Sequence, residues 1–189
     1  MSKPLPALVI GGSAGALDAL AVILPALPAG FPRAVAVVLH VPPGKSYLVD
    51  VLAARTVLPV KEAEDKEPFV AAHIYVAPPG YHLLVERDGT LALSVDDPVT
   101  FSRPSIDVLF ESAAEACGRG LVALLLTGAN EDGARGLVRV KAAGGSTLVQ
   151  SPESAPVPTM PQAAIRLGCV DRVLPLAEIG PHLAAMEAR

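Results

Sequence analysis

The sequence predicts an α/β fold: a doubly wound, mostly parallel sheet with an antiparallel edge hairpin, arranged as a Rossmann-like three-layer sandwich. Short, continuous apolar runs, such as 34–39 and 121–126, alternate with segments of helical periodicity, as expected of buried parallel strands covered by helices. Aromatic residues make up only 4% of the chain and hydrophobic residues 51%, so aliphatic side chains must build the core. The length of 189 residues suits one domain, which we expect to span residues 1–189.

The N-terminal elements are expected in alternating order. A buried strand over 7–10 stops at two glycines, and apolar residues then recur at helical spacing at Leu17, Leu20, Ala21 and Leu24. The pattern continues with a strand over 34–39, a helix over 47–54 and a short strand over 58–60. Residues 73–95 contain the turn signals Pro-Pro-Gly and Arg-Asp-Gly between short alternating runs, which indicates an antiparallel hairpin or meander at a sheet edge.

An amphipathic helix is the clearest element of the second half. One stripe at helical spacing holds its apolar residues, and Pro104 stands where a first-turn proline is tolerated; the stripe consists of Ile106, Leu109, Phe110, Ala113, Ala114 and Cys117. The remaining pattern predicts a strand over 121–126, a helix over 137–143, a strand over 147–150, a helix over 163–167, an extended segment over 170–173 and a helix over 176–188. The alternation favours right-handed crossover connections.

Composition excludes several classes of function. The net charge of −4 gives no electrostatic footprint for binding nucleic acid. Cys117 and Cys169 are too few for a disulfide scaffold or a metal site, and both stand in apolar surroundings. The N-terminal apolar run is too short for a signal sequence or a membrane span, so we expect a cytoplasmic protein without membrane insertion.

The first candidate for chemistry is Ser13, in a Gly-x-Ser-x-Gly motif over 11–15 between a predicted strand and a predicted helix. This context suits a nucleophile, because the N–H groups of the helix N-terminus can stabilise the oxyanion that develops on the substrate. The alternative is a glycine-rich turn with a helix-capping serine. A dinucleotide-binding fingerprint fails, because Ala16 replaces its third glycine and His40 stands where an acid should end the next strand.

His40 is the second candidate, because it ends the strand over 34–39 at the sheet edge where ligands bind in doubly wound folds. A serine hydroxyl needs an adjacent base, and imidazole titrates near the working pH. His73, His82 and His182 rank lower, because they lie in the hairpin or the last helix. The nearby tripeptide 44–46, Gly-Lys-Ser, lacks the first glycine of a phosphate loop and follows two prolines, so we reject a nucleotide triphosphatase.

Asp132 is the third candidate, in the loop that follows the strand over 121–126. It can orient the imidazole as the acid of a Ser-His-Asp triad, or it can simply cap the next helix. Three loops at the same sheet edge therefore carry Ser13, His40 and Asp132. Their order along the chain differs from that of the α/β-hydrolases, which excludes that family.

These motifs resemble those of the catalytic domain of CheB-type protein-glutamate methylesterases. The likeness runs from about residue 8 to residue 176 and is carried by Gly-Gly-Ser-Ala-Gly at 11–15, Val-Leu-His-Val-Pro at 38–42, Arg-Pro-Ser-Ile-Asp at 103–107 and Thr-Gly-Ala-Asn-Glu-Asp-Gly-Ala at 127–134. The resemblance implies that Ser13 is the nucleophile, His40 the general base and acid, and Asp132 the orienting carboxylate. It also implies oxyanion donors at the backbone N–H groups of Ala14 and Ala129.

The substrate that this resemblance implies is a glutamate γ-methyl ester on a methylated chemoreceptor, with possible deamidation of glutamine and with no cofactor or metal. Arg103 is expected to contact the acidic protein substrate; the alternative is a solvated loop arginine. The chain departs from the family at Ala14, Ala129 and Asn130, where members commonly have Thr, Met and Gly. Members usually carry a receiver domain before the esterase domain, so we expect control by a signalling partner in trans. A non-catalytic scaffolding module is the alternative function.

Overall fold

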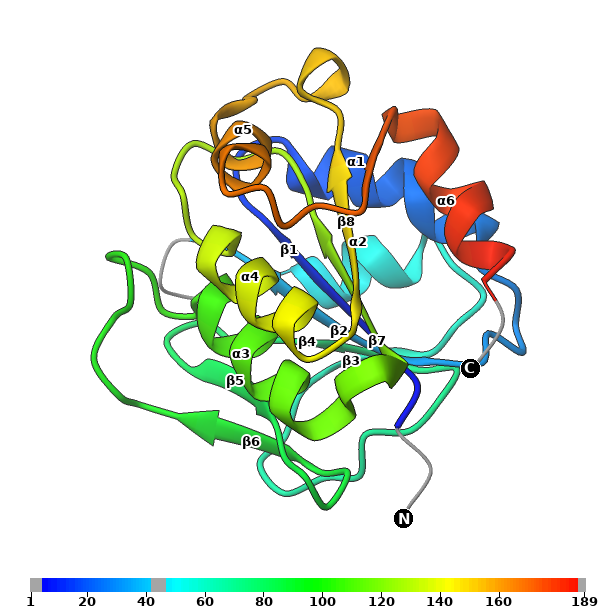
Figure 1. Cartoon of the computed structure of the whole chain (residues 1–189). Coiled ribbons are helices and arrows are strands. Elements are labelled where there is room, and N and C mark those ends of the chain that lie inside the picture. The colour runs from blue at the N-terminus through cyan, green and yellow to red at the C-terminus, as the bar shows by residue number, and fades with distance from the viewer. Residues whose placement is uncertain (1–4, 42–46, 187–189) are drawn as a thin grey trace.

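A computed structural model describes residues 5–41 and 47–186 of the chain. Its centre is a seven-stranded sheet in the order β3-β4-β2-β1-β7-β8-β9, in which every pair of neighbouring strands is parallel (Figure 1). The strands are β1 (Ala7–Gly12), β2 (Ala34–Leu39), β3 (Val60–Glu62), β4 (Ile74–Val76), β7 (Leu121–Leu125), β8 (Ser146–Gln150) and β9 (Arg172–Leu174). The prediction of a doubly wound α/β fold is confirmed.

Helices cover both faces of this sheet (Figure 1). One buried cluster joins one face to α3 (Ile106–Cys117), α4 (Ala134–Ala142) and α5 (Thr159–Arg166), and a second cluster joins the other face to α1 (Ala16–Ile23), α2 (Leu48–Ala53) and α6 (Leu176–Ala184). Alternate strand residues enter opposite clusters, as in Val9 and Leu8 of β1, because successive side chains of a strand point to opposite faces. The described residues also contain three short 3-10 helices: η1 (Leu24–Ala26), η2 (Gly118–Gly120) and η3 (Pro152–Ser154).

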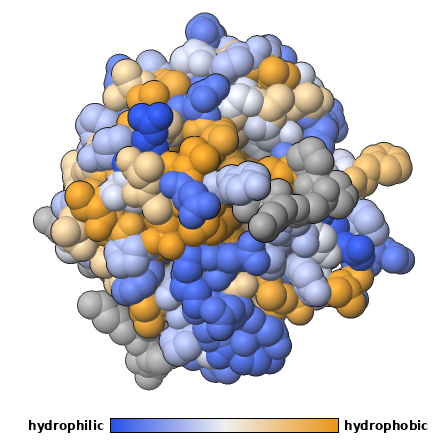
Figure 2. All heavy atoms as spheres, turned by 180° about the vertical axis from the view of Figure 1, so that it is seen from behind, coloured by the Kyte–Doolittle hydropathy of each residue, from blue (hydrophilic) through white to orange (hydrophobic). Residues whose placement is uncertain are grey.

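Seen from behind (Figure 2), the molecule shows hydrophobic side chains that gather near the middle among hydrophilic ones. Val22 on α1 and Val51 on α2 are among the exposed apolar residues of the described chain. Hydrophobic side chains exposed in this way are ordinary for a folded domain. No helix within 5–41 and 47–186 is long and apolar enough to cross a membrane.

The order of the strands places the candidate residues. Strand β1 pairs with β2 on one side and with β7 on the other, so the chain crosses between the two halves of the sheet at β1. Gly12 pairs with Leu39, and Gly11 pairs with both Val38 and Leu125, so the three strands end almost in register. The loops that follow them therefore meet at the crevice where doubly wound folds bind ligands.

The hairpin differs in place from the prediction. Strands β5 (His82–Val85) and β6 (Leu91–Ser94) pair antiparallel across the Arg-Asp-Gly turn, but they form a two-stranded sheet of their own, packed against α3. Strand β4, which was expected in the same meander, instead lies inside the main sheet between β3 and β2. All three residues of β4 are buried, as expected of an interior strand of a sheet that helices cover on both faces. The two prolines at 78 and 79 separate β4 from β5.

Several helix and strand boundaries in the structure also differ from the predicted ones. The helix predicted over 137–143 begins at Ala134, and the helix predicted over 163–167 begins at Thr159, because their first turns are mostly polar or small and show no apolar period. The strand predicted over 58–60 lies at Val60–Glu62, and Pro104 lies outside α3, before its N-cap Ser105. Four parts of the prediction lie outside the described residues: the first four residues, Pro42 of the Val-Leu-His-Val-Pro motif, the Gly-Lys-Ser tripeptide and the end of the last predicted helix.

Candidate active site

Ser13, His40 and Thr127 each begin a loop at the carboxyl edge of the sheet, and backbone hydrogen bonds hold these loops together. The N–H of Ser13 donates to the carbonyl of Thr127 at 2.9 Å, and the N–H of His40 donates to the carbonyl of Gly12 at 3.2 Å. The ladder that pairs β1 with β2 and β7 thus continues one residue beyond the strands. The backbone positions of Ser13 and His40 follow directly from the register of the sheet.

The turn that carries Ser13 passes from β1 into α1 within three residues. Ala16, the first residue of α1, donates its N–H to the carbonyl of Ser13 at 2.9 Å, and Gly15 takes a left-handed conformation with φ of 83°. The positive φ therefore falls on Gly15 and not on the serine, unlike the strained nucleophile elbow of α/β-hydrolases. A Cβ atom on Gly128 would lie 3.0 Å from the Cβ of Ser13, so the glycine lets the β7 loop approach the serine closely.

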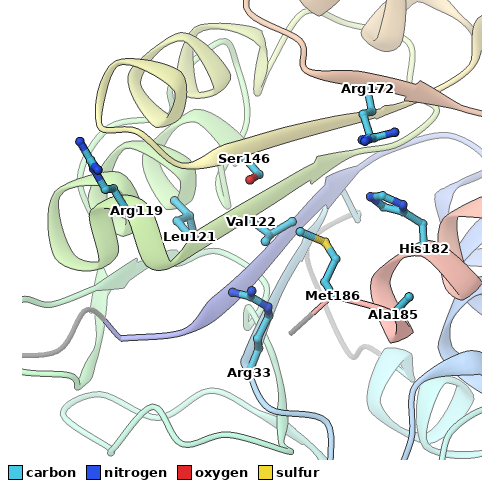
Figure 3. Close-up of a pocket in the computed structure, with 9 residues that line it drawn as sticks. All are labelled: Arg33, Arg119, Leu121, Val122, Ser146, Arg172, His182, Ala185 and Met186. Carbon is cyan, nitrogen blue, oxygen red and sulfur yellow. The ribbon is translucent and has the colours of Figure 1, made fainter. Parts of the chain in front are cut away.

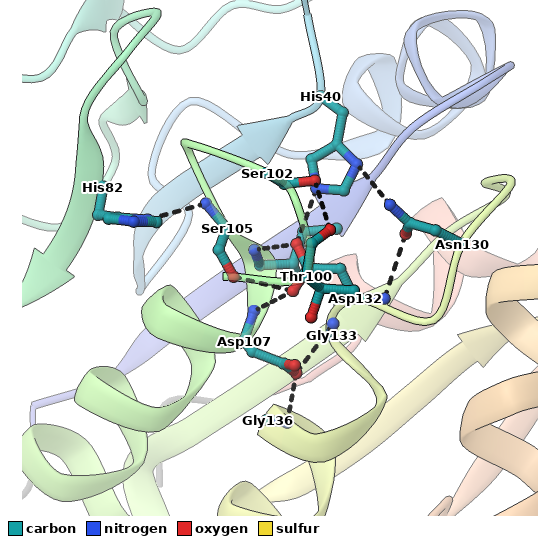
Figure 4. Close-up of polar contacts among 11 residues, drawn as sticks. His40, His82, Thr100, Ser102, Ser105, Asp107, Asn130, Asp132, Gly133 and Gly136 are labelled. Atoms are coloured by element: carbon teal, nitrogen blue, oxygen red, sulfur yellow. Dashed lines mark hydrogen bonds and ion pairs between the residues drawn. The ribbon is translucent and has the colours of Figure 1, made fainter. Parts of the chain in front are cut away.

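His40 and Asp132 form the pair that the sequence predicted (Figure 4). The Nε2 atom of His40 lies 2.7 Å from Oδ2 of Asp132, and the histidine side chain is 13% exposed while the carboxylate is fully buried. An ionised carboxylate only accepts hydrogen bonds, so Nε2 carries the proton that joins the two residues. In neutral His40 the lone pair then resides on Nδ1, which is the nitrogen left to act as a base.

Asp132 is held by the start of α3 as well as by His40 (Figure 4). Its Oδ2 also accepts the N–H of Ile106 at 2.7 Å, and its Oδ1 accepts the hydroxyl of Ser105 at 2.8 Å and the N–H of Asp107 at 3.0 Å. Burial alone would raise the pKa of Asp132, but the hydrogen bonds from His40, the two N–H groups and Ser105 together hold it below its usual value. Asp132 is therefore an anion fixed at a helix N-terminus.

Asp107 forms the layer behind Asp132. Its Oδ1 accepts the N–H of Gly133 at 2.9 Å and the N–H of Gly136 at 2.7 Å, and its side chain is almost fully buried. Burial raises the pKa of Asp107 to about 6, although the N–H groups of Gly136 and Gly133 lower it and the charge of Asp132 raises it further. Nothing in the sequence indicated this role, since an acid in the first turn of a helix is ordinary.

Asn130 touches both members of the pair. Its Oδ1 accepts the N–H of Asp132 at 3.1 Å, which leaves the amide nitrogen Nδ2 facing Nδ1 of His40 at 3.5 Å. The side chain therefore stands at the nitrogen of His40 that does not contact Asp132. Ala14 and Ala129, whose N–H groups are the predicted oxyanion donors, are exposed residues at the same edge, and neither N–H donates a hydrogen bond within the described residues.

Arg103 lies beside His40 but is turned to its own loop. Its Nη1 atom donates to the carbonyls of Val95 at 2.8 Å and Asp96 at 3.0 Å. A depression of about 570 Å³ separates this loop from the histidine, and it is lined by His40, Val41, Gly80, Pro98, Phe101, Ser102, Arg103 and Pro104. Arg103 is thus placed next to the cleft, and its contact with a protein substrate stays a prediction.

Four further residues support the site, and the sequence analysis gave none of them this role. Ser105 links Asp132 to His82, because its hydroxyl donates to Oδ1 of Asp132 at 2.8 Å and its backbone N–H donates to Nδ1 of His82 at 3.1 Å. On the other side, the buried Gln150 accepts the N–H of Thr127 at 3.0 Å, and the hydroxyl of Thr127 lies 3.0 Å from the carbonyl of Ala14. Buried polar side chains in strands or caps give no sequence signal of their partners, which come from other elements.

A separate depression lies at the opposite, amino edge of the sheet. It has a volume of about 420 Å³, and Arg33, Arg172 and His182 are among its lining residues (Figure 3). It is basic but lies away from the loops that hold Ser13 and Asp132. Within the part of the chain that the structure describes, no group of three or more His, Cys, Asp or Glu side chains could hold a metal ion.

The sequence and the fold of this chain both match those of known proteins. Residues 8–183 match the family model described as CheB methylesterase. The fold matches the crystal structure of the Thermotoga maritima CheB methylesterase catalytic domain with a TM-score of 0.91 and 35% identity, over 97% of this chain and 98% of that one.

Relatives in sequence have consistent names. A Leptospira interrogans protein, provisionally named protein-glutamate methylesterase/protein-glutamine glutaminase, is 45% identical over 176 residues, which cover 92% of this chain and 90% of the relative. The Bordetella parapertussis protein-glutamate methylesterase/protein-glutamine glutaminase is 40% identical over 183 residues, which cover 93% of this chain. The chain spans about half the length of this second relative, 51%.

Proposed function

Because the chain belongs to the CheB methylesterase family, we propose that it is a protein-glutamate methylesterase that hydrolyses glutamate γ-methyl esters of chemoreceptors. The single observation that carries this proposal is the 2.7 Å contact between His40 and the buried Asp132 beside the Ser13 turn. The products are the glutamate side chain and methanol. Deamidation of glutamine at the same positions, which the names of the relatives include, follows the same acyl-transfer chemistry.

The residues take the following roles. Ser13 Oγ attacks the ester carbonyl while Nδ1 of His40 takes its proton, and the imidazolium that forms is stabilised by Asp132. The backbone N–H groups of Ala14 and Ala129 donate to the oxyanion. The proton on Nδ1 then passes to the methoxide leaving group, and a water molecule, activated by the same nitrogen, releases the glutamate from Ser13. The balance is one water consumed and one methanol and one carboxylic acid formed.

Asn130 supports this assignment of the base. Its orientation is fixed by the N–H of Asp132, so its amide N–H faces Nδ1 in the free protein, and a donor there complements a lone pair on that nitrogen. The contact is long at 3.5 Å, so Ser13 or a water molecule can displace it at little cost. In this proposal the methylated chemoreceptor is the protein partner of the chain. Control by a signalling partner that acts in trans stays a prediction.

The test is methanol release from methylated receptor membranes by the purified chain. Ser13→Ala should reduce kcat by roughly 10³-fold or more, because the hydroxyl that forms the covalent intermediate is lost. Its melting temperature should stay close to that of the wild type, since Ser13 is held by its backbone N–H. Wild-type turnover by Ser13→Ala would overturn the mechanism, and binding of receptor without any turnover by the wild type would favour the scaffolding module.

A further inference from the structure

The loop that borders the cleft ends in a two-residue turn with an unusual backbone. Val99 and Ser102 exchange backbone hydrogen bonds of 3.1 and 2.9 Å, and the two residues between them, Thr100 and Phe101, have φ of 50° and 61°. Positive φ at both central residues is the pattern of a type I′ turn, which normally requires Asn and Gly. Neither a β-branched threonine nor a phenylalanine is an ordinary choice there.

The side chain at the tip of this turn is unprotected. Phe101 has an exposed fraction of 103%, the largest among the exposed hydrophobic residues of the chain that the structure describes. The strained backbone lowers the stability of the free protein, and the fully exposed side chain buries no apolar area that could offset this cost. Such a position is expected where the side chain is used in a complex.

The base of the turn is held rigidly and is connected to the catalytic carboxylate. Arg103 binds the carbonyls of Val95 and Asp96, and Nε2 of the buried His82 lies 3.1 Å from the carbonyl of Asp97. His82 in turn accepts the N–H of Ser105, whose hydroxyl binds Asp132. The turn therefore keeps a fixed position relative to His40, and the two share the depression of about 570 Å³.

We propose that Phe101 is a docking anchor that inserts into an apolar strip of the methylated receptor, beside the glutamate ester that lies at His40. This inference rests on the proposed function. A helical receptor segment that presents one ester to Ser13 must extend past the cleft, and the turn borders that cleft. Burying a rigid aromatic side chain gives a large contact area at a small loss of conformational entropy, which is why such residues dominate many interfaces.

The fit has a charge component as well. Arg103 holds a positive charge at the base of the turn, and the glutamates produced by demethylation are negative. The occupant that fits this surface is therefore an apolar strip flanked by glutamate side chains, and a second copy of this chain is the competing occupant. The two occupants differ in what the loss of Phe101 should change.

The experiment compares wild type, Phe101→Leu and Phe101→Gly on two substrates. The substrates are methylated receptor membranes, followed by methanol release, and a small activated ester, p-nitrophenyl acetate. We expect Phe101→Gly to lower kcat/KM on the receptor by about 10- to 100-fold, mainly through KM, and to change the small ester by less than about threefold. Phe101→Leu should recover most of the receptor activity, because it keeps an apolar side chain at the tip.

Stability separates docking from damage to the fold. Glycine adopts positive φ without strain, so Phe101→Gly should melt at the same temperature as the wild type or about 2–4 °C higher. Val57→Ser is the matched control. Val57 is 71% exposed but precedes β3, at the amino edge of the sheet, so its replacement should leave both activities unchanged.

The outcomes are distinct. Wild-type kcat/KM for Phe101→Gly on the receptor, while the wild type releases methanol, would overturn the anchor and leave the proposed function standing. A smaller sedimentation coefficient for Phe101→Gly, with unchanged kcat/KM on the receptor, would assign the turn to self-association. That result would also overturn the proposal that Phe101 is a docking anchor. Hydrolysis of the small ester but not of receptor by the wild type would overturn both proposals.

Discussion

Asp107 and Asp132 cap each other's helices. Asp132 precedes α4 and accepts the N–H groups of Ile106 and Asp107 at the start of α3, while Asp107 lies in α3 and accepts the N–H groups of Gly133 and Gly136 at the start of α4. Each carboxylate therefore stabilises the helix that carries or follows the other. The carboxylate of Asp132 is held by this reciprocal arrangement and not by His40 alone.

The first prediction is that Asp107→Asn stabilises the protein at alkaline pH. An asparagine keeps the Oδ1 acceptor that both N–H groups use, and it removes the cost of ionising a buried carboxyl. Folding raises the pKa of Asp107 from 3.8 to about 6, so the folded state holds this proton more tightly than the unfolded state. The carboxyl therefore lowers stability progressively as the pH rises from about 4 to 6, and the cost persists above pH 6.

Urea unfolding measures this effect. At pH 8 the free energy of unfolding of Asp107→Asn should exceed that of the wild type by roughly 1–3 kcal/mol, and the difference should shrink towards pH 4.5. Asp107→Ala, which loses both hydrogen bonds, should be less stable than Asp107→Asn at every pH. A loss of stability in Asp107→Asn that does not vary with pH would contradict the assignment.

The same chemical change at Asp132 should have the opposite sign. Asp132→Asn replaces an oxygen that accepts two hydrogen bonds with a nitrogen that accepts none, so two buried donors lose their acceptor. We expect a loss of roughly 2–4 kcal/mol in stability at pH 7 and a fall in kcat of about 10³- to 10⁴-fold. Thermal unfolding and methanol release check the two effects separately.

The pH dependence of Asp132 follows from its lowered pKa. The folded state holds this proton less tightly than the unfolded state, so the stabilisation is present above the unfolded pKa and is lost as the pH falls through the folded value. Between neutral and acid pH, the free energy of unfolding of Asp107→Asn should therefore fall more steeply than that of the Asp107→Asn, Asp132→Asn double variant. Equal slopes in the two variants would show that Asp132 does not drive acid unfolding.

The pH profile of activity is the third prediction. Nδ1 of His40 must be unprotonated to take the Ser13 proton, so kcat/KM on the small ester should fall as the pH is lowered from neutrality. Asp132 stays ionised through this range, but Asp107, with a pKa of about 6, titrates within it, so Asp107→Asn should show the same fall if His40 is the cause. Activity that is constant down to about pH 5 would rule out a histidine base.

The fourth prediction concerns Arg103. Arg103→Ala should raise KM for methylated receptor more than it lowers kcat, either through a lost contact with substrate glutamates or through a looser turn. Arg103→Lys separates the two causes, because lysine keeps the charge but cannot reproduce the planar guanidinium contact with both carbonyls. Recovery of KM in Arg103→Lys indicates direct contact, and an unchanged KM in Arg103→Ala contradicts both.

The sequence was sufficient for the parts of the fold that are buried on both faces. Strands β1, β2 and β7 are runs of apolar residues, and the stripe of α3 was assigned residue by residue. The edge strands β3 and β9 were displaced by one or two residues, because they are short and partly exposed, with Lys61, Glu62 and Arg172 among their residues. Partial exposure weakens the pattern that identifies a strand.

For the site, the sequence by itself determined which residue types stand at the ends of the central strands: Ser13, His40 and Asp132. It could do so because the carboxyl ends of parallel strands share one edge. Only the tertiary structure decided that Nε2 of His40 meets an acid 92 residues away, and that Asp107, Ser105 and Asn130 hold the pair. Hydrogen bonds depend on distance and direction between side chains of different elements, and no periodicity along the chain encodes these.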